Sequence, residues 1–228
     1  MTALLFLVGC ADGGSTQNAG NHYDYSFAVD TEGWSGGFSD YTQYDEAIYE
    51  LSFTHTTLPS PLNENDGAVR ISGNNHSDDL FMFMKTKIRE LDANTTYEVK
   101  FTVEFASNAA DNMVGIGGAP GESVVLKAGA STVEPKAVAD ESGYLHMNID
   151  KGNQTGSGVN MSVIGNFANG SDLNEYKLKT LRSTDPVYVT ADTNGTVWLI
   201  VGTDSGFEGI TTIFYNQVTV DLRKVSSD

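Results

Sequence analysis

Hydrophobic and polar residues alternate with a period of two along several segments of the chain. The clearest segment is 97–105, in which Tyr, Val and Phe alternate with Glu, Lys and Thr. The same alternation begins at Tyr23 and returns across 210–220. A period of two places the apolar side chains on one face of a β-strand and the polar side chains on the other. These segments therefore predict strands with one buried face and one solvated face.

Short apolar runs bounded by Gly, Asn and Asp predict further strands. We expect them near 47–53, 68–72, 80–84, 123–127, 144–149, 160–164, 187–191 and 196–201. Asn194-Gly195 predicts a tight hairpin between the last two. No long stretch has a period of 3.6, and residues 86–91 offer at most one helical turn. The pattern predicts an all-β fold: a two-sheet β-sandwich of the jelly-roll type, formed as one domain by residues 22–228.

The start of the chain has a different pattern. An apolar run at 3–6 leads into Leu7-Val8-Gly9-Cys10, which contains the only cysteine and resembles a bacterial lipobox. The run is too short for a bilayer span of about 20 residues. We therefore expect 1–9 to be a lipoprotein signal peptide and 10–21 to be the lipidated cysteine with a flexible tether. No Lys or Arg precedes the apolar run, which predicts that the true start lies upstream.

This pattern predicts an exported protein that is anchored to a membrane of the bacterial cell envelope through a lipid on Cys10. Thirty acidic residues against thirteen basic ones give a net charge of −17. Such a surface repels phosphate, so nucleic acid is excluded as a partner, while neutral ligands and divalent cations are favoured. The four histidines lack a zinc-binding spacing, and Cys10 is assigned to lipidation.

Three segments carry a resemblance to a known family. A strand running into 30–34, a long alternating strand opened by 91–97 and a closing strand at 214–220 resemble the galactose-binding-like jelly rolls, which include many carbohydrate-binding modules. The blocks 73–83 and 201–209 resemble uncharacterised bacterial lipoproteins. The resemblance implies a jelly-roll fold and a saccharide as the ligand.

The resemblance also implies a structural calcium ion. In the similar modules the end of the first strand lies close to the last strand, and the two often hold Ca²⁺ between them. Here those positions carry Asp30 and Glu32 in the first region and Asn216 or Asp221 in the second. Carboxylate and amide oxygens are ligands that Ca²⁺ prefers. We therefore expect a calcium site that uses Asp30, Glu32 and Asn216.

Aromatic residues cluster between positions 34 and 49. Tyr41 and Tyr44 have polar neighbours, so we expect both rings to be exposed and able to stack on a sugar ring. Asp40 and Asp45 would then accept hydrogen bonds from sugar hydroxyl groups. These four residues form the predicted saccharide-binding face.

Two further predictions concern single residues. His76 and Asp78 lie in a polar loop at 74–79, which either binds the ligand or forms a turn whose side chains satisfy the backbone; the turn is favoured. Trp34 and Trp198 are expected in the core.

Three functions remain open at this point. We favour a non-catalytic, lipid-anchored saccharide-binding protein over a jelly-roll glycan hydrolase or lyase and over a surface adhesion or assembly protein. The segment Gly33–Gly37 matches G-x-S-x-G, but no helical pattern follows it, so it predicts a glycine-rich turn rather than a nucleophile elbow. An enzyme would need a cleft with converging acids, with His76 or His146 among them.

Overall fold

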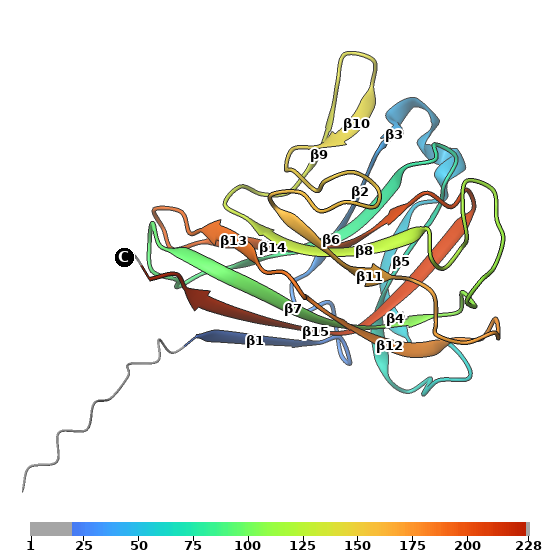
Figure 1. The fold of residues 1–228 in the computed structure, drawn as a ribbon, viewed down its shortest axis with the longest axis horizontal. Helices are drawn as coiled ribbons and strands as arrows, with labels where there is room; N and C mark the ends of the chain where they lie inside the picture. Colours follow the sequence, from blue (N-terminus) through green and yellow to red (C-terminus); the bar gives the residue numbers. More distant parts are fainter. Residues whose placement is uncertain (1–19, 227–228) are drawn as a thin grey trace, which may run out of the picture.

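The computed structural model describes residues 20–226 and contains two large β-sheets packed face to face (Figure 1). Cys10, the predicted signal peptide and most of the predicted tether lie outside the described residues. The seven-stranded sheet has the order β12-β7-β15-β5-β4, with β1 also paired to β15 and β13 also paired to β7. The five-stranded sheet has the order β11-β8-β14-β6-β2. All pairings are antiparallel, and the chain alternates between the sheets from β5 to β8, as in a jelly roll.

The strands of the seven-stranded sheet are β1 (Asn21–Ser26), β4 (Ser52–Thr57), β5 (Gly67–Asn74), β7 (Thr96–Ser107), β12 (Lys177–Arg182), β13 (Val187–Thr190) and β15 (Ile210–Lys224). Those of the five-stranded sheet are β2 (Ser35–Ser39), β6 (Leu80–Ile88), β8 (Val124–Ser131), β11 (Met161–Asn166) and β14 (Val197–Ser205). A third sheet has the order β3-β10-β9, formed by β3 (Tyr41–Thr42), β9 (Ala137–Ala139) and β10 (Tyr144–Met147). One 3-10 helix, η1, spans Gln43–Tyr49.

The β-sandwich predicted from the alternating pattern is confirmed. In β7 the side chains from Tyr97 to Phe105 alternate between the core and the solvated face. The core between the sheets also contains alternate residues of β15, β6, β8 and β14. None of the helical segments in the described part of the chain has the length and hydropathy of a transmembrane span.

Three local predictions were wrong. The predicted strand at 47–53 begins as the 3-10 helix η1. The glycine-rich segment turns only at Thr31–Trp34, because residues 35–39 form β2. The predicted hairpin at Asn194-Gly195 has the expected tight turn, but its two strands lie in different sheets. Alternation shows which face of a strand is buried, and it does not identify the strand's partner.

The five-stranded sheet is buried on both faces, which is the feature that positions the site. Every residue of β8 is buried, as are nearly all residues of β14. On the outer face Phe81 and Phe83 pack with Ile149, Met161 and Ile200 in a second small core. The segment 148–160 and the third sheet supply its cover, and Figure 1 shows the β9–β10 hairpin rising above the sandwich. Polar groups on this face therefore need partners within the protein.

Candidate functional site

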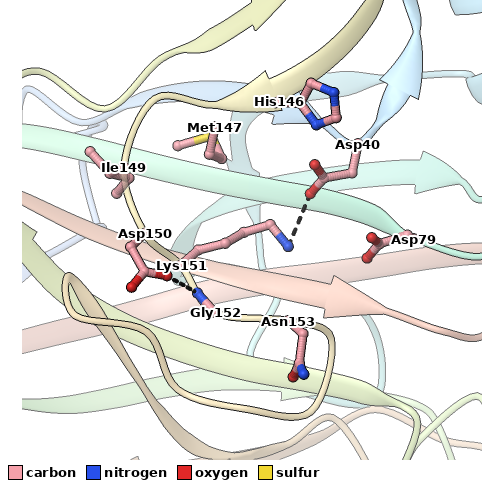
Figure 2. Close-up of a pocket in the computed structure, with 9 residues that line it drawn as sticks. All are labelled: Asp40, Asp79, His146, Met147, Ile149, Asp150, Lys151, Gly152 and Asn153. Atoms are coloured by element: carbon pink, nitrogen blue, oxygen red, sulfur yellow. Dashed lines mark hydrogen bonds and ion pairs between the residues drawn. The ribbon is translucent and has the colours of Figure 1, made fainter.

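A polar pocket of about 260 Å³ lies on the outer side of the five-stranded sheet (Figure 2). Its lining residues come from the β2–β3 junction, the start of β6, β10 and the segment that follows β10. They are Asp40, Asp79, His146, Met147, Ile149, Asp150, Lys151, Gly152 and Asn153. A pocket of this volume has room for several water molecules or a small ligand.

A buried ion pair forms the floor beneath the pocket. Lys127 of β8 and Asp204 of β14 both have fully buried side chains, and Lys127 Nζ lies 2.8 Å from Asp204 Oδ2. The same ammonium group donates to the carbonyl oxygens of Lys151, at 3.1 Å, and Asn153. These three acceptors satisfy all three N–H groups of Lys127. The ion pair therefore fixes the backbone of the segment that lines the pocket.

Lys151 extends from this segment toward the floor. Its ammonium group lies 2.8 Å from Asp204 Oδ2 and 3.0 Å from Asp40 Oδ2, and it sits above the Phe81 ring, 5.1 Å from the centroid. Figure 2 shows the Lys151 side chain pointing to Asp40, with Asp79 beside them. Lys151 thus joins the buried ion pair to the pocket wall.

The local backbone presents the two acids of the wall. Asp40 has a φ of 67° between β2 and β3, a left-handed conformation that Asp adopts more readily than most residues. Its N–H donates to Leu145 O at 2.7 Å, and Ser77 Oγ donates to its carbonyl oxygen at 2.9 Å. Asp79 immediately precedes β6 and is half-buried.

Burial governs the protonation of this cluster. Burial, followed by the nearby Asp204 carboxylate, raises the pKa of Asp79 to about 7. Burial also raises the pKa of Asp40, although Lys151 opposes the shift. Burial lowers the pKa of Lys127, with Asp204 acting in the opposite direction. Lys151 differs: burial acts to lower its pKa, but Asp204 and Asp40 together raise it.

The carboxylates of Asp40, Asp79 and Asp204 are close enough to hold a metal ion, with one oxygen from each lying within 4.8 Å of the others. In residues 20–226 this is the only such group of acids and histidines. Two ammonium groups already contact this group, and Ca²⁺ needs six to eight oxygen ligands without nearby cations. The donor set therefore fits a salt-bridge cluster better than a metal centre.

The rim of the pocket is polar and more exposed. His146 Nε2 lies 3.1 Å from Asp140 Oδ2, and the imidazole packs against Tyr144. Asp150 accepts the N–H groups of Gly152, at 3.0 Å, and Val159, at 2.9 Å, and these hydrogen bonds lower its pKa. Met147 and Ile149 add an apolar strip to the wall.

The predicted saccharide-binding face is only partly assembled. Asp40 lines the pocket, but Tyr41 is 4% exposed, so the prediction that its ring is exposed was wrong. Its hydroxyl donates to Glu46 Oε2 at 3.1 Å, and its ring packs on Tyr49. Tyr44 is 74% exposed, as predicted, and Asp45 is exposed beside it on η1. Tyr41 lies on β3 and packs in the core, whereas Tyr44 lies on η1 and is exposed.

The loop 74–79 is a turn, as favoured. Asn75 donates its amide to the carbonyl oxygens of Ser205 and Phe207, at 2.8 and 3.0 Å, and accepts the N–H of Ser77. His76 is exposed and packs edge-on against Tyr49. Asp78 is exposed, and its carbonyl oxygen accepts the Gln154 amide. A role for His76 or Asp78 in ligand binding stays a prediction.

The two tryptophans differ. Trp34 is 2% exposed and belongs to the core, as predicted. Trp198 is only partly buried on the outer face of the five-stranded sheet, where the ammonium groups of Lys87 and Lys85 lie 5.0 and 5.5 Å from its ring. The assignment of Trp198 to the core was therefore wrong: Trp198 is the one residue of β14 that is not fully buried, and a strand with apolar side chains on both faces does not show in its sequence which of them remain partly exposed.

The regions predicted to hold calcium lie close together. Phe27, at the end of the first strand, donates its N–H to Asn216 O at 3.1 Å. Asp30 and Glu32 are exposed in the turn that follows, where Asp30 Oδ1 accepts the Glu32 N–H at 2.7 Å. The Asn216 side chain donates to Glu104 Oε1 at 2.9 Å. Calcium binding at Asp30, Glu32 and Asn216 stays a prediction.

Sequence reasoning missed Lys127, Lys151 and Asp204, which organise the pocket. A signal was present: Lys127 follows three apolar residues, Val124–Leu126, and precedes Ala128 in a strand that does not alternate. A non-alternating apolar strand is buried on both faces, so a charge within it needs a buried partner.

A scan against protein families finds no match to this chain, and a search of curated proteins likewise finds none. Solved structures with similar architecture include a carbohydrate-binding module described as promiscuous in specificity, with 9% identity and a TM-score of 0.39 over 85% of this chain. The chain spans 57% of that structure's length.

Two further similar structures cover most of their own chains. One is a carbohydrate-binding module in complex with β-1,4-galactotriose, with 12% identity and a TM-score of 0.32 over 84% of this chain and 88% of the other. The other is a sugar-binding protein, by its description, from Bacteroides thetaiotaomicron, with 8% identity and a TM-score of 0.38 over 82% and 87% of the two chains. At these values the similarity concerns architecture and does not extend to a ligand.

Proposed function

We propose that this chain is a saccharide-binding protein whose ligand occupies the pocket over Lys151. The observation that carries the proposal is the composition of the pocket wall. Carboxylate, imidazole, amide and ammonium groups surround an apolar strip formed by Met147 and Ile149. A sugar ring presents hydroxyl groups at its edge and C–H groups on its face, so it matches a wall with both kinds of group. Small-molecule sites commonly combine an apolar surface with a few fixed polar groups.

The charge of the pocket supports this ligand class. Asp40, Asp79 and Asp150 outnumber Lys151 at the wall, and the chain as a whole carries a net charge of −17. An anionic ligand such as a phosphate or a uronic acid would be repelled. The buried ion pair of Lys127 and Asp204 holds the wall in place before the ligand arrives, which reduces the entropy lost on binding.

A glycan array followed by calorimetry with the best ligand tests the proposal. Asn153→Ala and His146→Ala each remove one hydrogen-bonding group from the rim, so each should weaken binding about tenfold, the equivalent of about 1.4 kcal/mol. Thr180→Ala is the matched control, because Thr180 lines a separate polar hollow on the solvated face of the seven-stranded sheet. Binding lost with Thr180→Ala but kept with the rim variants would place the ligand elsewhere.

A glycan-active enzyme is the second candidate, and one observation favours it. Asp79 combines a pKa of about 7 with a neighbouring carboxylate at the pocket wall, as expected of a general acid. A reducing-sugar release assay with wild type and Asp79→Asn separates the two functions. Release by the wild type that Asp79→Asn abolishes would establish catalysis, and the absence of release leaves binding as the function.

We further propose that the protein is exported and anchored in a bacterial cell envelope by a lipid on Cys10, on the strength of the lipobox-like pattern Leu7-Val8-Gly9-Cys10. In the native host, Cys10→Ala should abolish fatty-acid labelling and release the protein into the soluble fraction. Labelling and membrane retention that persist in the variant would contradict the anchor. A structural calcium ion at Asp30, Glu32 and Asn216 is a separate proposal. It is supported by the resemblance to the galactose-binding-like jelly rolls and by the preference of Ca²⁺ for carboxylate and amide oxygens.

A further inference from the structure

The buried cluster beneath the pocket has one negative charge too many. Its members are three carboxylates, Asp40, Asp79 and Asp204, and two ammonium groups, Lys127 and Lys151. With all five ionised, the cluster would carry a net charge of −1. An uncompensated charge in a buried site is strongly unfavourable, and the usual response is for one group to become neutral. One additional proton makes the cluster electrically neutral.

Two unsatisfied oxygen atoms show where that proton belongs. Asp204 Oδ2 accepts from both lysines, whereas Asp204 Oδ1 is buried and has no hydrogen-bond partner among the described residues. Asp79 Oδ1 is likewise buried and without a partner. One oxygen of the Asp79 carboxyl group lies within 4.8 Å of one oxygen of the Asp204 carboxyl group. A proton on one of them supplies the missing donor to the other.

We propose that Asp79 and Asp204 share one proton, and that the pocket therefore binds an uncharged polyhydroxylated ligand through a carboxylic acid at Asp79. The ligand part rests on the proposed saccharide-binding function, whereas the shared proton does not. The single O–H of this acid is used between Asp79 and Asp204, so the other Asp79 oxygen is left as an uncharged acceptor for sugar hydroxyl groups. The proton also removes the charge that would favour a cationic ligand.

The groups that face Asp79 agree with this assignment. Asp204 and Lys127 face it from β14 and β8, Asp40 from the β2–β3 junction, Lys151 from the segment after β10, and Tyr144 and His146 from β10. The N–H groups of Lys127 are all used by other acceptors, and Lys151 pairs with Asp204 and Asp40. Neither lysine therefore neutralises Asp79. Burial and the Asp204 charge raise the pKa of Asp79 to about 7, in the direction that the geometry requires.

Carboxyl-carbon NMR of the full chain tests the shared proton directly. The Asp79 signal, assigned by its loss in Asp79→Asn, should titrate with a midpoint near pH 7, about three units above an unperturbed aspartate at ~3.9. Asp78→Asn is the matched control, because Asp78 is the exposed neighbour and its positive φ suits Asn. This control should leave the Asp79 midpoint unchanged. An Asp79 midpoint near pH 4 would overturn the inference. So would a midpoint that millimolar calcium shifts down to about pH 4, because the three carboxylates would then hold a metal ion and not a proton.

The best neutral sugar from the array tests the ligand part. If only the protonated site binds, the population of competent protein falls about tenfold between about pH 6 and about pH 8, and the affinity should fall by the same factor. Asp79→Asn should lose this dependence. Equal affinity at both pH values would refute the acid at Asp79 while leaving saccharide binding intact. If the Asp79 signal titrates near pH 7 but no sugar binds at either pH, the shared proton is supported. The proposed saccharide-binding function and its ligand class are then refuted.

Discussion

Lys127 Nζ lies 2.8 Å from Asp204 Oδ2, and both side chains are fully buried beneath the pocket wall. Removing one partner of such a pair leaves an uncompensated buried charge. We expect Lys127→Met to lower the free energy of unfolding by about 3–5 kcal/mol. Lys100→Met is the control, because Lys100 pairs with Glu98 at 3.3 Å on the exposed face of β7, and such pairs contribute about 1 kcal/mol or less.

Urea denaturation of both variants, of Asp204→Leu and of the double variant Lys127→Met/Asp204→Leu measures the coupling. The double variant should lose about 1–3 kcal/mol less free energy of unfolding than the sum of the two single losses. The reason is that each single variant leaves the other charge without its partner, whereas the double variant removes both charges. Additive losses would show that the two residues do not form the pair on which the wall depends.

The two tyrosines of the predicted binding face should respond differently to substitution. Tyr41 is buried and donates to Glu46, so Tyr41→Phe should lower the free energy of unfolding by about 1 kcal/mol and Tyr41→Ala by about 3–5 kcal/mol. Tyr44 is exposed, so Tyr44→Ala should change stability by no more than about 0.5 kcal/mol. Thermal melting of the three variants measures the difference, and a large loss for Tyr44→Ala would contradict it.

The alternating pattern was sufficient to predict the sandwich but not the pairing of its strands. The period of two in 97–105 reports that one face of β7 is buried, and β7 indeed alternates. It carries no information on which strand lies beside it, so the tight turn at Asn194-Gly195 was assigned to a hairpin although β13 and β14 belong to different sheets. Strand β2 was missed because glycine usually interrupts strands.

Gly37 shows why glycine is accepted in β2. The Phe83 ring lies over this residue so closely that a Cβ atom there would come within 2.3 Å of the ring. The contact depends on a residue far along the chain and therefore leaves no local signal. The site shows the same contrast. Asp40 could be proposed from its neighbours in the sequence, whereas Lys151 and Asp204 come together only through tertiary packing and leave no local signal.

The stability of the fold should contain a component that falls as the pH rises. The pKa of Asp79 is about 7 in the folded chain against about 3.9 for an unperturbed aspartate, so the native state holds an extra proton between these values. This contribution is complete below about pH 4 and is lost as the pH rises through about 7. Asp79→Asn should therefore flatten the pH dependence of the free energy of unfolding and be more stable than wild type at about pH 8. Parallel curves for wild type and variant would exclude the shift.

Calcium should stabilise the fold if Asp30, Glu32 and Asn216 bind it. A ligand that binds only the native state at about a hundredfold excess over Kd adds about 2.7 kcal/mol, which raises Tm by several degrees. Asp30→Asn should remove the effect, whereas Asp45→Asn, on the exposed side of η1, should retain it. Melting curves with calcium and with a chelator provide the measurement, and identical curves would remove calcium from this site.

The most direct test of saccharide binding in the pocket is a map of backbone amide NMR shifts during titration with the best sugar from an array. The largest shifts should lie at His146, Lys151 and Asn153, with Asp40 and Asp79 beside them, because these residues line the pocket. Shifts centred instead on Thr102, Thr180 and Gln217, across the solvated face of the seven-stranded sheet, would contradict the proposed site.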